Sequence, residues 1–275
     1  NQIIDNPLIT SAWNDGVGVI NYRGWGDANG WHKPYFHNDS IDELFNGLRL
    51  PVVFSFVCNT GDFGSSLPKC FGETLITGGS MSNPKGAVAM VGPSDLDTDT
   101  RFNNIMCAVM WDEMLEGRIP ELAPALHAGK QSLIKEFNDD GIVGTTNIAE
   151  FYHHVYGVLG DPSLSVWLGE PKSMSHANIL YGRSDTSLFV STTILGDEII
   201  DVVGALLHDG KLIAKGLSNE VGELIIVFPD EYAGFDMTLY LNKAQYFQEE
   251  IQLNVPPEPE EISISYNYEI PTENS

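Results

Sequence analysis

Three short apolar runs recur along the first third of the chain, and each is followed by glycine or by a polar turn. They cover residues 16–22 (GVGVINY), 51–57 (PVVFSFV) and 86–92 (GAVAMVG). Continuous apolar runs of this length, rich in Val, Ile or Phe, are typical of strands that are buried on both faces of a parallel sheet. The pattern therefore predicts three strands of one buried sheet.

Helix-like segments lie between these runs and after them. Residues 40–47 open with a serine cap and acidic residues, and residues 69–77 follow a proline. Residues 103–115 and 124–137 carry apolar side chains at helical spacing. The alternation of strands and helices predicts a doubly wound α/β domain, whose functional groups gather at the carboxyl ends of the strands.

The pattern changes near residue 172, where short strand-like runs follow one another with turns between them. They cover residues 188–195, 199–207, 212–215, 224–228, 237–241 and 251–255, and residues 208–211 (HDGK) are a strong hairpin signal. We predict an immunoglobulin-like β-sandwich over residues 172–255, after the α/β domain of residues 1–171. Residues 256–275 begin with several prolines and lack basic residues, which predicts a linker or a surface-draped tail.

Charge and cysteine content narrow the functional classes. The 275 residues include 14 Lys and Arg against 38 Asp and Glu, a formal net charge of −24. This charge repels phosphate backbones and argues against a nucleic-acid partner. No apolar run approaches the roughly 18 residues that a membrane span needs. The 3 cysteines are an odd number, so at least one thiol is expected to be free. The chain does not begin with methionine, and we expect a fragment or a processed product.

Cys58 is the first candidate for chemistry. It directly follows the most apolar strand-like run, so it should lie at the carboxyl end of a central strand, where an α/β sheet presents reactive groups. The turn that follows would leave the sulfur exposed beside free backbone N–H groups, which favour a thiolate. The alternative is a buried structural cysteine, a common fate of a free cysteine.

A glycine-bearing loop is the second candidate. Residues 21–30 (NYRGWGDANG) follow the preceding strand, and glycines such as Gly24 and Gly26 allow the close backbone approach that an oxyanion hole requires. The spacing does not match a dinucleotide-binding motif, and there is no phosphate-loop lysine. We therefore expect no required cofactor, and we predict that N–H groups near Gly24, Gly26 and Cys58 form an oxyanion hole.

These segments together resemble the gingipain-type cysteine peptidases, relatives of caspases, clostripain and legumain. The likeness rests on five segments in order: INYRGWG, FVCNTGDFG, PKCFGE, KGAVAMVGPS and YGVLGDPSLSVW. It implies a caspase-like fold, a three-layer sandwich around a parallel sheet, with its amino-terminal part missing. It also implies that the following domain is immunoglobulin-like, that Cys58 is a nucleophile, and that the protein is secreted or lies at the cell surface.

Two departures from this family bear on activity. Family members have glycine–histidine–glycine where this chain has Gly24, Trp25 and Gly26, so Trp25 stands in the slot of the catalytic imidazole. We predict that a loop folds His32 back as a substitute base; the alternative is a loop histidine without a partner. The family's earlier strands are absent, which would leave a bare strand edge. We expect an amino-terminal segment or a second chain to cover it.

Acidic residues follow the third predicted strand. If residues 94–101 (SDLDTDTR) are extended, Asp95, Asp97 and Asp99 point the same way, and they could bind a basic substrate side chain or calcium. Asp97 and Asp99, with Trp25, are our candidates for substrate binding. A solvated acidic loop is the alternative, and the sequence does not match a calcium-binding EF-hand loop. His127, His153 and His154 are expected to be packing or surface residues. We therefore assign no metal ligands from the sequence.

The sequence thus predicts a secreted cysteine endopeptidase that acts on a peptide or protein substrate. Two alternatives remain open. The chain could be an inactive pseudopeptidase used for binding or surface assembly, because Trp25 replaces the histidine. It could also be a calcium-stabilised adhesion module, because of its charge and its aspartate run.

Overall fold

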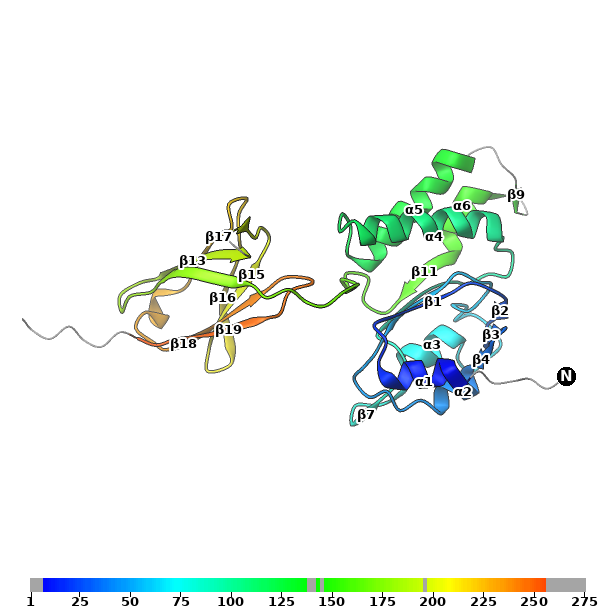
Figure 1. The fold of residues 1–275 in the computed structure, drawn as a ribbon, viewed down its shortest axis with the longest axis horizontal. Helices are drawn as coiled ribbons and strands as arrows, with labels where there is room; N and C mark the ends of the chain where they lie inside the picture. The colour runs from blue at the N-terminus through cyan, green and yellow to red at the C-terminus, as the bar shows by residue number, and fades with distance from the viewer. Residues whose placement is uncertain (1–6, 138–141, 144–145, 195–196, 256–275) are drawn as a thin grey trace, which may run out of the picture. The chain divides into compact units, whose positions relative to one another are not determined.

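The computed structural model describes residues 7–137, 142–143, 146–194 and 197–255. The chain divides into two compact units, Asn1–Glu170 and Pro171–Ser275, which are described separately (Figure 1). Within the described residues, no helix combines the length and the apolar character that crossing a membrane requires.

A four-stranded sheet forms the centre of the first unit, in the order β1-β5-β8-β11. Its strands are β1 (Val19–Tyr22), β5 (Val52–Ser55), β8 (Ala89–Pro93) and β11 (Tyr156–Leu159). The first three are parallel, as the apolar runs predict, whereas β11 is antiparallel to β8. The sheet is therefore mixed rather than wholly parallel, because the chain returns from its last helix directly into an edge strand.

Helices cover both faces of this sheet and make three layers (Figure 1). One face packs against α4 (Thr100–Leu115), α5 (Leu122–Phe137) and α6 (Ile148–Val155), and the other against α1 (Pro7–Asp15), α2 (Asn38–Asp42) and α3 (Phe71–Ile76). Alternate side chains of the central strand go to opposite faces, with Phe54 in the first core and Val53 in the second. Helix α1 is absent from our sequence prediction, and α2 begins two residues before the predicted segment.

Short strands complete the first unit. They are β2 (Gly26–Asp27), β3 (Gly30–His32) and β4 (Tyr35–His37) in one small sheet, with the pairs β6 (Gly79–Ser80) and β7 (Asn83–Pro84), and β9 (Ile142–Val143) and β10 (Thr146–Asn147).

The small β2-β3-β4 sheet corrects one expectation. We predicted His32 in a loop free to fold back, but it is the last residue of β3. The reason is the pattern of burial: Trp31 and Phe36 lie opposite each other in the ladder and are 1% and 0% exposed. Their rings pack beside Trp13 and Phe71, so the core fixes these strands.

The second unit contains two antiparallel sheets around one core. One sheet joins β12 (Ser175–Leu180), β13 (Ser187–Ile194), β14 (Asp197–Glu198) and β17 (Glu223–Val227), and the other has the order β16-β15-β18-β19. The strands of the second sheet are β15 (Val203–His208), β16 (Lys211–Leu217), β18 (Met237–Asn242) and β19 (Glu249–Leu253), and a short 3₁₀ helix, η1 (Asp230–Tyr232), precedes β18. Leu188 and Leu224 from one sheet meet Leu206 and Leu239 from the other in a shared core.

The turn between β15 and β16 confirms the predicted hairpin. His208 pairs with Lys211, and Asp209 and Gly210 both have positive φ, 48° and 73°, as a two-residue hairpin turn requires. The run predicted over residues 199–207 begins later, at Val203, because Asp201 adopts a φ of 55° that interrupts the strand. The predicted tail, residues 256–275, lies outside the described residues, and the immunoglobulin-like identity of this unit stays a prediction.

Candidate functional site

Cys58 lies just beyond the carboxyl end of β5, one of the two central strands of the sheet. The chain turns sharply after it, because Asn59 adopts a φ of 61°. Two hydrogen bonds tie this turn to the end of β8 and to the segment after it: Asn59 N–H donates to the Asp95 carbonyl at 3.0 Å and Gly61 N–H to the Pro93 carbonyl at 2.8 Å. The turn after Cys58, the nucleophile candidate, is therefore held between the ends of β5 and β8.

Cys58 differs from the other two cysteines in its exposure. Its side chain is half-buried, whereas Cys70 is 0% and Cys107 8% exposed. Burial raises the pKa of the Cys70 thiol and of the Cys107 thiol. Both of these thiols therefore stay protonated to higher pH, and the shielding that the sequence predicted for them is present.

The Cys58 sulfur contacts one residue 40 positions further along the chain. Thr98 Oγ1 donates a hydrogen bond to Cys58 Sγ at 3.3 Å, and the thiol faces the Thr98 carbonyl oxygen at 3.7 Å. Sequence reasoning missed Thr98, because our attention in that loop went to the aspartates on either side of it. Its position after a strand that neighbours β5 was the signal available.

The Gly24–Trp25–Gly26 turn is held by the hydroxyl of Tyr22. That oxygen accepts from Trp25 N–H at 3.2 Å and lies 2.9 Å from the Trp25 carbonyl. A Cβ atom at Gly24 would lie 2.4 Å from it, so the turn requires glycine there. The Trp25 side chain points to solvent and is 71% exposed.

Backbone donors are available where the sequence predicts an oxyanion hole. In the part of the chain that the structure describes, neither Cys58 N–H nor Gly24 N–H donates a hydrogen bond. Gly26 lies in β2, opposite Trp31 in the small sheet. Free N–H groups such as those of Cys58 and Gly24 suit a developing oxyanion.

His32 belongs to a chain of hydrogen bonds along the small sheet. Asn29 Nδ2 donates to His37 Nδ1 at 3.0 Å, so the His37 proton resides on Nε2, which lies 3.0 Å from His32 Nδ1 and donates to it. His32 Nε2 then faces an Asp27 carboxylate oxygen at 3.5 Å. Both ring nitrogens of His32 are thus engaged, and among the described residues no hydrogen bond joins His32 to Cys58.

The aspartates after β8 do not form the extended row that we expected. Asp95 accepts from Asp97 N–H at 2.9 Å, and Asp99 caps α4 by accepting from Arg101 N–H at 2.7 Å. The segment is therefore a turn that ends in a helix cap, because Asp is well suited to both roles. Asp97 is exposed, so of the two aspartates proposed for substrate binding it is the one whose carboxylate has no local backbone role.

A polar depression lies beside Cys58, between the loops that follow three of the strands. It is lined by Asp27, Ala28, Asn29, Asn59, Asp62, Ser65, Ser66, Leu67 and Leu96. Asn59 is the residue next to the nucleophile candidate, and Asp27 is the residue that faces His32. A peptide lying across the carboxyl end of the sheet would meet carboxylate, amide and hydroxyl groups here, flanked by two leucines.

Other candidate groups lie elsewhere. His127 and His153, on α5 and α6, pack edge to face at 5.7 Å, and burial lowers the pKa of His153, while His154 Nε2 lies 3.7 Å from Glu150. Over the described residues, no group of three or more His, Cys, Asp or Glu is arranged to hold a metal ion.

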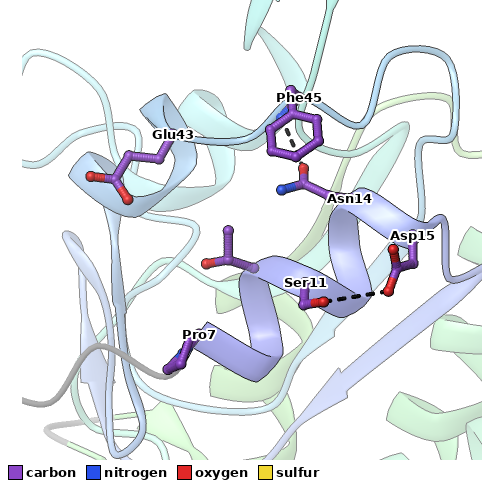
Figure 2. Close-up of a pocket in the computed structure, with 7 residues that line it drawn as sticks. Pro7, Ser11, Asn14, Asp15, Glu43 and Phe45 are labelled. Atoms are coloured by element: carbon purple, nitrogen blue, oxygen red, sulfur yellow. Dashed lines mark hydrogen bonds between the residues drawn. The ribbon is translucent and has the colours of Figure 1, made fainter.

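Figure 2 shows another pocket, beside α1, in which Asn14 Oδ1 accepts a hydrogen bond from Phe45 N–H at 2.8 Å. This pocket involves none of the strand-end loops.

Arg23 is a further residue that the sequence did not single out. It follows β1, and its positive charge partly offsets the effect of burial on the pKa of the Cys107 thiol. Burial raises the pKa values of Tyr152 and Tyr156, and the neighbouring Cys58 raises them further. The Arg23 charge lowers both values. A cation from the end of β1 therefore lies among the groups around the Cys58 site.

Comparison with known proteins gives consistent results. The profile of peptidase family C25 matches residues 4–167. Gingipain R2 of Porphyromonas gingivalis is 28% identical over 223 residues, which are 75% of this chain and 28% of that protein. Gingipain R1 of the same organism is 28% identical over 218 residues, which cover 76% of this chain and 20% of that protein. The chain thus spans between 12% and 28% of the length of the curated relatives that it matches.

Solved structures show the same fold. The crystal structure of the Arg-specific cysteine proteinase gingipain R (RgpB) superposes with a TM-score of 0.73 at 21% identity, over 91% of this chain and 56% of that one. The complex of the Porphyromonas gingivalis RgpB pro- and mature domains gives a TM-score of 0.73 at 20% identity, over 90% of this chain and 56% of that one.

Proposed function

The chain belongs to peptidase family C25, and on this premise we propose that it is a cysteine endopeptidase that hydrolyses peptide bonds through the Cys58 thiolate. The observation that carries the proposal is the placement of Cys58. It follows a central strand at the carboxyl end of the sheet, and it is half-exposed while the other two cysteines are buried. The chain supplies the nucleophile itself, so the reaction requires no cofactor; calcium as a stabilising ion stays a prediction.

The proposed reaction has two steps. Cys58 Sγ attacks the carbonyl carbon of the scissile bond, and the N–H groups of Cys58 and Gly24 donate to the oxygen that becomes negative. The C–N bond then breaks, the amine leaves with a proton from a general acid, and a thioester joins the acyl group to Sγ. Water hydrolyses the thioester and restores the thiol.

His32 is the proposed proton carrier, and its hydrogen bonds define what it must do. As arranged, its Nε2 bears the proton and faces Asp27, which is the form of a general acid. To act as the base, His32 must first move its proton from Nε2 to Nδ1 and donate it to His37 Nε2, which leaves His32 Nε2 free to accept. The His37 proton must then move to Nδ1, and the Asn29 amide must turn its oxygen toward it. The ring must also turn from Asp27 toward Sγ.

A second candidate function is a catalytically inactive peptidase-like protein that binds peptides or assembles surfaces. Two observations favour it: Trp25 occupies the slot in which the family resemblance expects the histidine, and both nitrogens of His32 are engaged away from Cys58. In this function the polar depression beside Asn59 holds a peptide that is not cleaved.

The substrate or ligand in either case is an extended peptide segment. Trp25 and Asp97 lie on the segments that follow β1 and β8 and have exposed side chains, and the depression next to Asn59 offers Asp27, Asp62 and two leucines. Asp99 contributes less in this scheme, because its carboxylate caps α4.

The open edge of β1 is the proposed attachment point for another strand. Among the described strands β1 pairs with β5 on one side and with none on the other. An apolar groove runs beside this edge, lined by Leu8, Ile9, Ala12, Val17, Val19 and Ile20. We place an amino-terminal segment or a second chain there, because an unpaired edge beside apolar side chains favours strand addition. Location outside the cell or at its surface stays part of this proposal.

Digestion of a mixed peptide library separates the two functions. The full chain, Cys58→Ala and the control Cys107→Ala are each incubated with the library at neutral pH, and products are identified by mass spectrometry. A peptidase produces new peptide ends with the full chain and with Cys107→Ala but not with Cys58→Ala. Peptide binding without cleavage, unchanged in Cys58→Ala, supports the binding function and overturns the proposed reaction.

A further inference from the structure

The hydroxyl group of Thr98 contacts the Cys58 sulfur but has no role in the proposed reaction. It donates directly to the sulfur of Cys58, at 3.3 Å, from the turn that follows the neighbouring strand. Within the described residues, the hydrogen-bond partners of Cys58 Sγ are both atoms of Thr98, and neither is an imidazole. The sulfur therefore accepts a hydrogen bond from a hydroxyl group, where a cysteine peptidase would use a histidine.

The two contacts from Thr98 favour opposite protonation states of the sulfur. The carbonyl oxygen, at 3.7 Å, is an acceptor and suits the neutral thiol, whereas the hydroxyl is a donor and suits the thiolate. The hydroxyl contact is the shorter, and a donor that bonds to an ionised acceptor contributes more than one that bonds to a neutral acceptor. The hydroxyl bond is therefore the one of the two that gains strength when the sulfur is ionised.

The segment that carries Thr98 is firmly held. Tyr152, on α6, uses its hydroxyl twice on the next residue: it accepts from Asp99 N–H at 2.7 Å and donates to the Asp99 carbonyl at 2.9 Å. Burial raises the pKa of Tyr152, so its hydroxyl keeps the proton that this second bond needs. Ser94, at the other end of the segment, donates through its backbone N–H to the Val155 carbonyl at 2.9 Å, a bond that Ser94→Ala retains. The backbone on both sides of Thr98 is thus held in place.

We propose that Thr98 is a catalytic residue whose hydroxyl stabilises the Cys58 thiolate, and that Tyr152 is the positioning residue that holds Thr98 in place. The inference rests on the proposed function, because it gives the thiolate of that reaction a partner in the absence of a histidine at position 25. It predicts that the reactivity of Cys58 depends on one hydroxyl group from the turn after β8.

Alkylation by iodoacetamide tests this without requiring peptidase activity. The Cys58 thiol loses its proton to solvent, the thiolate sulfur attacks the methylene carbon, a C–S bond forms and iodide leaves. The rate is measured by peptide mapping between pH 6 and 10 for the full chain and for Thr98→Val, Thr98→Ser, Tyr152→Phe and Ser94→Ala. The last variant removes a hydroxyl from the same turn that does not touch sulfur.

We expect Thr98→Val to slow alkylation of Cys58 at neutral pH by on the order of tenfold and to move the pH profile upward, because a hydrogen bond to a charged group is lost. Thr98→Ser should restore the rate, Tyr152→Phe should lie between, and Ser94→Ala should react like the parent. Circular dichroism and thermal unfolding of each variant establish that it is folded.

Two different failures can be told apart. If Cys58 of the parent chain reacts quickly and Thr98→Val has the same rate and pH profile, Thr98 has no such role, while the proposed function stands. If Cys58 of the parent chain stays unmodified at every pH at which Cys70 and Cys107 also stay unmodified, the proposed function itself fails. The inference is also overturned if Cys58 is alkylated as slowly in Thr98→Ser as in Thr98→Val. Serine keeps the hydroxyl, so the slower alkylation would then come from altered packing and not from the lost hydrogen bond.

Discussion

The imidazole rings of His32 and His37 meet edge to face, with His32 Nδ1 3.0 Å from His37 Nε2. They lie at diagonal positions of the β3–β4 ladder, and each ring has a further partner, Asp27 for His32 and Asn29 for His37. Protonation of both rings would place two positive charges in contact. A charge on His32 therefore disfavours a charge on His37.

The pH dependence of stability should report this pair. Burial lowers the pKa of His37, and the neighbouring His32 lowers it further. The unfolded chain thus binds a proton at His37 more readily than the folded chain does. The stabilising contribution is complete above the unfolded value of about 6.5 and is lost as the pH falls below it. Thermal unfolding midpoints from pH 5 to 8 should therefore decline toward acid.

The variant His37→Gln should show a shallower decline, because glutamine can still donate to His32 but does not titrate. His176→Gln, on β12 in the other unit, is the matched control and should retain the parent slope. Equal slopes for the parent chain and His37→Gln would show that the ring pair does not govern acid stability.

Restoring an imidazole at position 25 should increase activity. Trp25 is 71% exposed, so replacing it costs little packing. The family resemblance places the catalytic histidine at this position, and general base catalysis contributes on the order of a hundredfold or more. Trp25→His should raise the rate of peptide cleavage by about that factor, measured on a fluorogenic peptide. Trp25→Gln, which has no base, should not raise the rate.

Trp31 should be a main support of the small sheet beside the site. It is 1% exposed, stacks on Tyr22 at a centroid distance of 4.3 Å, and donates from Nε1 to Ser55 Oγ on the nucleophile strand at 3.0 Å. Trp31→Ala should lower the free energy of unfolding by about 3–5 kcal/mol, because a large cavity forms. Urea unfolding followed by circular dichroism measures this, and Trp31→Phe should cost clearly less. A loss within about 0.5 kcal/mol for Trp31→Ala would contradict the packing described here.

The strands β1, β5 and β8 of the first unit follow from the sequence, because continuous apolar runs had to be buried on both faces. The antiparallel direction of β11 and the strands β2 to β4 do not, since strands of two or three residues carry no periodic signal and take shape only when Trp31 and Phe36 enter the core. The placement of Cys58 is predictable from its position after a strand. Its contact with Thr98, 40 residues away, is tertiary and has no local signature.

The second unit should be dispensable for the chemistry. It contains none of the three cysteines, and its described residues have their own core. A chain ending at Glu170 should lose stability yet keep Cys58 labelling at a rate within about twofold of the full chain, measured by peptide mapping. A truncated protein that folds, by circular dichroism, but no longer labels would show that the second unit helps to form the site.

The most direct test of the central claim is covalent trapping by a peptidyl acyloxymethyl ketone, in which a peptidase thiolate displaces the carboxylate and forms a thioether. The full chain is treated at neutral pH, and the adduct is located by mass spectrometry of its peptides. The account predicts a single adduct on Cys58, absent from Cys58→Ala and retained in Cys107→Ala. A chain that stays unmodified at Cys58, or that is modified at Cys70 or Cys107 instead, would contradict it.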